Sequence, residues 1–168
     1  MQYADLVMNA WLAWLEGTAL SVWVREDISV FAFPTVLSFH TIGMGFVAGL
    51  SAVIALRILG IAPGVPLLEM KRYFVVMWIG FWVNAISGVL LLIGYPTKAL
   101  TNPLFYIKLA LIALAVVCVR LIQRRVFENT GPPTNGKFFA AASLFCWAAV
   151  IVSGRLLAYT YSKLTQNG

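Results

Sequence analysis

The chain has 168 residues, of which 61% are hydrophobic and 11% are charged, with a formal net charge of +6. A soluble domain has about 45–50% apolar and roughly 25% charged residues, so this composition excludes a cytosolic enzyme, a nucleic-acid-binding domain and a disordered chain. It predicts an integral membrane protein of one domain, whose excess of basic residues gathers on cytoplasmic loops and requires no nucleic-acid partner.

The N-terminal region, residues 1–27, is predicted to form an amphipathic helix that lies along the membrane surface. Its two faces differ in chemistry: Gln2, Asp5, Asn9 and Glu16 fall on the polar face, and Val7, Trp11, Trp14 and Leu15 fall on the apolar face. Tryptophan favours the headgroup region, and a helix with this pattern lies in the plane of the interface. The alternative is a helix that docks on the bundle or on a partner protein.

The remainder of the chain, residues 28–168, is predicted to cross the bilayer four times. A span needs about 20 mostly apolar residues, and four stretches qualify: about 33–59, 73–93, 104–122 and 138–161. The first apolar run begins near Ser29, but proline suits the first turn of a helix, so Pro34 predicts a start near Phe33. The predicted fold is therefore an all-α, polytopic membrane protein: a four-transmembrane-helix bundle preceded by an interfacial helix.

The basic residues in the loops and at the ends of the spans predict the orientation of the bundle. Seven of them fall on one side: Arg57, Lys71, Arg72, Arg120, Arg124, Arg125 and Lys137. Arg25, Lys98 and Lys163 fall on the other side. Because basic loops stay in the cytoplasm, both termini are expected on the periplasmic side of a bacterial inner membrane.

Four polar residues lie within the predicted spans: His40, Asn84, Lys108 and Arg155. An ionisable residue in a membrane span is costly and is therefore a candidate functional residue. His40, the only histidine, is expected about 10 Å from the outer end of its helix at 1.5 Å per residue. Lys108 and Arg155 are also expected in the outer half of the membrane, nearer the surface. The pattern places two cations above one imidazole.

This arrangement suits a b-type haem, because an imidazole ligates the iron and surface cations pair with the propionates. His40 is the predicted axial and metal ligand, and Gly43 allows a helix or a flat macrocycle to approach closely. The second ligand of the iron would be Met77 of this chain or a residue of a neighbouring subunit. Alternatively, the iron would have no second ligand. A chlorophyll-type pigment and a copper(I) site of His40, Met44 and Met77 are alternatives. The structural alternatives are a hydrogen-bonded core histidine, cations that reach the headgroups, and small residues that serve helix packing.

Three segments resemble a bacterial family of four-helix inner-membrane proteins, a domain of unknown function: FPTVLSFHTIGMGFVAGLSAVIALRILG (33–60), NPLFYIKL (102–109) and VSGRLLAY (152–159). The recurring positions of this family match His40, Gly43, Arg57, Asn102, Phe105, Lys108, Gly154, Arg155 and Tyr159. Leu37 and Leu56 stand where many members have an acidic residue. The resemblance implies the four-helix fold and adds Asn102 and Tyr159 as supporting polar groups. More distantly, the architecture is similar to haem-carrying membrane cytochromes and copper-resistance type membrane domains.

The sequence therefore predicts a haem b subunit that transfers electrons at the outer face of the membrane and leaves catalysis to a redox partner or another membrane-protein subunit. Two other functions stay open. One is a cofactor-free structural or accessory subunit, possible because 11 Phe, 6 Trp and 6 Tyr supply contact surface for proteins or pigments. The other is a small-molecule carrier or channel with Lys108 and Arg155 at its mouth.

Overall fold

The computed structural model describes residues 2–61, 63–64, 66–128 and 135–166, and within these residues every regular element is helical. Four helices are long and apolar enough to cross a membrane. They are α3 (Phe33–Leu59), α4 (Lys71–Gly94), α6 (Pro103–Ile122), which a π-helical turn extends over Gln123–Glu128, and α7 (Gly136–Gln166). The all-α, four-span architecture expected from the sequence is confirmed. The side chain of Lys163, like the loop residues 129–134, lies outside the described part.

Local sequence signals explain where the long helices begin and end. Proline occupies the first turn of α3 and of α6, and the side chain of Asn102 caps α6 by accepting a hydrogen bond from the Leu104 backbone N–H at 3.0 Å. Helix α3 ends at Gly60, whose φ of 90° is left-handed, a conformation that glycine adopts without steric cost. The start of α3 at Phe33 matches the expectation from Pro34.

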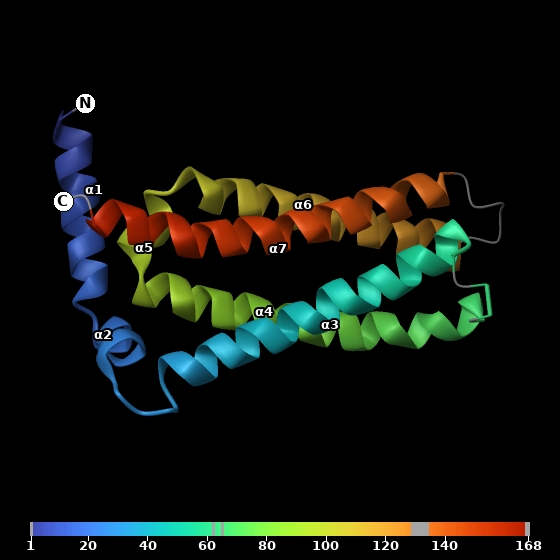
Figure 1. Cartoon of the computed structure of the whole chain (residues 1–168), viewed down its shortest axis with the longest axis horizontal. Helices are drawn as coiled ribbons and strands as arrows, with labels where there is room; N and C mark the ends of the chain where they lie inside the picture. The colour runs from blue at the N-terminus through green and yellow to red at the C-terminus, as the bar shows by residue number, and fades with distance from the viewer. Residues whose placement is uncertain (1, 62, 65, 129–134, 167–168) are drawn as a thin grey trace.

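The four long helices form two antiparallel hairpins, α3 with α4 and α6 with α7, which are joined mainly by α3 against α7 (Figure 1). The chain termini and helices α1 (Gln2–Glu16), α2 (Ala19–Glu26) and α5 (Pro96–Leu100) lie at one end of the bundle, here called the cap end. At the opposite end α3 and α6 finish and α4 and α7 begin. This end carries the seven basic residues counted above and is called the basic end.

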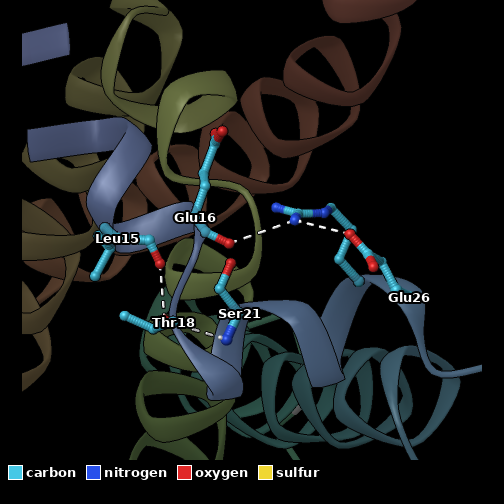
Figure 2. A network of polar contacts seen from close by, with 6 residues as sticks. Leu15, Glu16, Thr18, Ser21 and Glu26 are labelled. Atoms are coloured by element: carbon cyan, nitrogen blue, oxygen red, sulfur yellow. Dashed lines mark hydrogen bonds and ion pairs between the residues drawn. The ribbon is translucent and has the colours of Figure 1, made fainter. Parts of the chain in front are cut away.

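The N-terminal region differs from the single helix expected over residues 1–27, because it contains two helices. Gly17 separates them, and Thr18 caps α2 by accepting a hydrogen bond from the Ser21 backbone N–H while its hydroxyl donates to the Leu15 carbonyl (Figure 2). Arg25 donates to the carbonyl of Glu16 at 3.4 Å and pairs with Glu26 at 3.0 Å. These bonds fix the turn from α1 into α2.

Helix α1 lies across the cap end of the bundle (Figure 1). Leu12 is its buried contact, whereas Val7, Trp11 and Trp14 are exposed. The side chains of Gln2 and Asp5 lie outside the described part. The tryptophan face therefore points away from the bundle, as expected for a helix whose aromatic residues meet headgroups.

The buried core lies in the half of the bundle next to the basic end. Its members come from all four long helices and include Ile54, Phe74, Met77, Val119 and Trp147. In the half next to the cap end, α3 is buried at Val36 and Gly43 and exposed on most other faces. The side chains singled out by the sequence lie in this less densely packed half.

Candidate functional site

His40 is held against α4 by a set of hydrogen bonds. Its Nδ1 atom lies 3.0 Å from the backbone carbonyl of Asn84 and 3.2 Å from the hydroxyl of Ser87. In the opposite direction, the side-chain amide of Asn84 donates to the backbone carbonyl of His40 at 2.7 Å. The ring also stands close to Gly88, where an added Cβ would lie 3.1 Å from its Cε1 atom. An alanine at position 88 would therefore crowd the ring.

These contacts define how the imidazole is used. Nδ1 also lies 3.3 Å from the side-chain amide nitrogen of Asn84. In the tautomer that is protonated at Nδ1, the ring donates to the Asn84 carbonyl, because a backbone carbonyl only accepts hydrogen bonds. Ser87 donates to the carbonyl of Val83 at 2.6 Å, which leaves its oxygen able to accept from the same N–H. Nε2 then carries a lone pair and has no hydrogen-bond partner among the described residues. An imidazole oriented through Nδ1 with a free Nε2 is the usual form of a metal-ligating histidine.

Lys108 joins α6 to α7 in the same half of the bundle. Its side chain lies next to Gly154, where an added Cβ would be 3.7 Å from Nζ. Within the described part of the chain, no carboxylate pairs with it. The half of the bundle that holds His40 therefore also holds an amine that has no acidic partner among the described residues.

Gly43 has a different place from the one expected beside a macrocycle. An added Cβ would lie 2.7 Å from the backbone nitrogen of Asn84 and 2.8 Å from the carbonyl of Gly80. Gly80 is equally close to α3, with Phe46 Cβ at 2.7 Å from its own added Cβ. Gly43 thus allows α3 and α4 to touch backbone to backbone, and it sets the position of His40 over Asn84.

The other predicted residues are not gathered at His40. Arg155 is exposed, and no described contact joins it to His40 or Lys108. Tyr159 is 64% exposed, and Asn102 caps α6. Met77, the candidate second ligand, is 2% exposed in the core and lies seven residues along α4 from Asn84, about 10 Å at 1.5 Å per residue. The structure therefore does not bring Met77 to the imidazole.

The sequence indicated Asn84 as a polar residue within a span, but Ser87 was missed. A signal was present, because Ser87 lies three residues after Asn84 and therefore shares its helical face. Among the described residues, no group of three or more His, Cys, Asp or Glu side chains is placed to hold a metal ion.

These features define the class: a multi-pass, all-α membrane protein with a polar site in one half of its bundle. Comparisons with protein-family models, curated proteins and solved structures gave no match to this chain. The site is therefore interpreted from its own geometry.

Proposed function

We propose that the protein is a haem b-binding membrane subunit that transfers electrons at the periplasmic face of a bacterial inner membrane, with both termini on that side. The observation that carries the proposal is the state of His40: Nδ1 is engaged by the Asn84 carbonyl at 3.0 Å, and Nε2 has no partner among the described residues. A carbonyl that accepts a hydrogen bond from Nδ1 raises the basicity of the remaining nitrogen toward a metal.

The donor set of the site is consistent with this cofactor. His40 would hold the iron, which when bound would supply reversible one-electron chemistry, and Lys108 would pair with a propionate. Arg155, the residue that follows Gly154, would reach the second propionate from the membrane surface. Asn84 and Ser87 orient the imidazole, while Gly43 and Gly88 let α3 and α4 approach closely enough to do so. A second axial ligand, where one is required, would come from a partner subunit.

The test is the absorption spectrum of the purified protein, oxidised and reduced, before and after incubation with hemin. Wild type should show a Soret band that His40→Ala abolishes. Lys108→Gln should retain the band with a lower affinity for hemin, because it removes a charge and not the ligand. Thr41→Ala, an exposed position on the same helix, is the matched control and should behave as wild type. A His40→Ala variant with the wild-type spectrum would refute the proposal.

A second candidate is a cofactor-free accessory subunit. It is favoured by the reciprocal bonds between His40 and Asn84, which lock α3 to α4 without any ligand. In that case wild type would bind no hemin, and His40→Ala would lower the stability of the bundle without changing any spectrum.

A further inference from the structure

The basic end of the bundle carries an unusual charge balance. Its seven basic residues are accompanied by two acidic ones, Glu69 and Glu128. The seven basic side chains thus outnumber the two acidic ones and give this end an excess of positive charge.

At this end, Arg120 is placed by an aromatic ring. Its guanidinium carbon lies 4.1 Å from the centroid of the Trp78 ring, so that α6 is bridged to α4. Stacking uses the flat face of a guanidinium and leaves its N–H groups directed outward in the plane. Arg120 is exposed, and no described acceptor receives those N–H groups. The arrangement holds a bidentate anion donor in a fixed orientation.

The level of this pair along the helices is within reach of lipid headgroups. Trp78 lies seven residues into α4 from Lys71, about 10 Å from the helix end at 1.5 Å per residue. A long arginine side chain at such a depth extends toward the headgroups. An acidic protein partner would meet the loops first, whereas a phospholipid phosphate can be reached from this depth.

Exposed apolar side chains continue from this pair toward the middle of the membrane. On α4 they include Ile79 and Trp82, which follow Trp78, and on α6 Leu114 and Val117, which precede Arg120. A cation that reaches the headgroups and an apolar surface below it match the two parts of one phospholipid.

We propose that Arg120, stacked on Trp78, binds the phosphate of an anionic phospholipid whose acyl chain lies against the exposed apolar side chains of α4 and α6. The excess of positive charge at the basic end selects an anionic headgroup over a zwitterionic one. The proposal is independent of haem binding, because the site lies at the other end of the bundle from His40.

The experiment measures binding of phosphatidylglycerol or phosphatidylcholine to the full-length protein in detergent, through the rise in unfolding temperature with lipid concentration and by native mass spectrometry. Wild type should be stabilised by phosphatidylglycerol and much less by phosphatidylcholine. Arg120→Gln should weaken the apparent affinity for phosphatidylglycerol about tenfold, because it removes a hydrogen bond to a charged group. Lys71→Gln also removes one positive charge from the basic end, but from a residue that no aromatic ring positions. It should lower the apparent affinity for phosphatidylglycerol less than about threefold.

Two further variants separate the geometry from the charge. Arg120→Lys keeps the charge but loses the planar fork, and Trp78→Leu removes the ring that places the guanidinium. Both variants should weaken phosphatidylglycerol binding more than Lys71→Gln does. If Arg120→Gln does not fold, these two variants provide the test. Equal stabilisation of wild type by the two lipids would overturn the proposal. So would equal losses in Arg120→Gln and Lys71→Gln, which would indicate attraction to the basic end as a whole.

Discussion

His40 and Asn84 bind each other in both directions across the α3–α4 interface. The Asn84 side chain donates to the His40 carbonyl at 2.7 Å, and the His40 ring contacts the Asn84 carbonyl at 3.0 Å. Each residue thus uses its side chain on the other's backbone. The exchange fixes the rotation of both helices as well as their separation, and so it determines where the free face of the imidazole points.

Asn84→Ala should destabilise the folded protein by about 0.6–1.7 kcal/mol, the range measured for hydrogen bonds between membrane helices. The measurement is the free energy of unfolding of the protein in mixed micelles titrated with SDS. Ser38→Ala is the control, because its hydroxyl bonds to the Pro34 carbonyl of its own helix and is exposed. A loss no larger than that of the control would contradict a role for Asn84 in joining the helices.

Gly43→Ala should separate α3 from α4. The added Cβ would meet backbone atoms at 2.7 and 2.8 Å, and backbone yields less easily than a side chain, so a loss of about 1–3 kcal/mol is expected. Gly45→Ala is the matched control, because nothing lies within 4 Å of its added Cβ. That control should be neutral or slightly stabilising, since alanine is the better helix former. Equal stability of the two variants would show that the close approach is not required.

The hydroxyls of Ser51 and Ser143 lie 3.0 Å apart in the buried contact between α3 and α7. A double-mutant cycle with Ser51→Ala, Ser143→Ala and the double variant should give a coupling free energy of about 0.6 kcal/mol, the average for such pairs. Unfolding in SDS provides the four values. Strict additivity of the two single losses would indicate that the hydroxyls do not interact in the membrane.

Asp27 accepts a hydrogen bond from the Ser29 backbone N–H at 2.7 Å, and this bond lowers the pKa of its carboxyl, with the Ser29 side chain adding to the effect. Because the folded-state pKa is lowered, the contribution to stability is present above the ordinary pKa of aspartate. It is lost as the pH falls through the lowered folded value. Carbon-13 NMR of the Asp27 carboxyl should report the lowered pKa. Ser29→Ala should raise this pKa only in part, because the backbone N–H of residue 29 remains. A return of the pKa to the ordinary value of aspartate would contradict the backbone hydrogen bond as its main cause.

The membrane class and the four spans follow from the sequence itself, because the length and hydropathy of a segment determine whether it can cross a bilayer. Proline and glycine positions also located helix ends: Pro34 predicted the start of α3, where the structure begins it. The short helices were harder to predict from the sequence. The break between α1 and α2 was marked only by Gly17 and Thr18, within a continuous amphipathic pattern.

The sequence also placed His40 and Lys108 in one half of the membrane, because scarce polar residues in apolar helices stand out. Which groups they contact was decided only by the tertiary structure. Helix periodicity gives the faces of a helix but neither the rotation nor the offset of two packed helices. Those depend on the backbone contact of Gly43 with Gly80 and Asn84, and that contact placed the imidazole over Ser87 and Gly88 and left Met77 in the core.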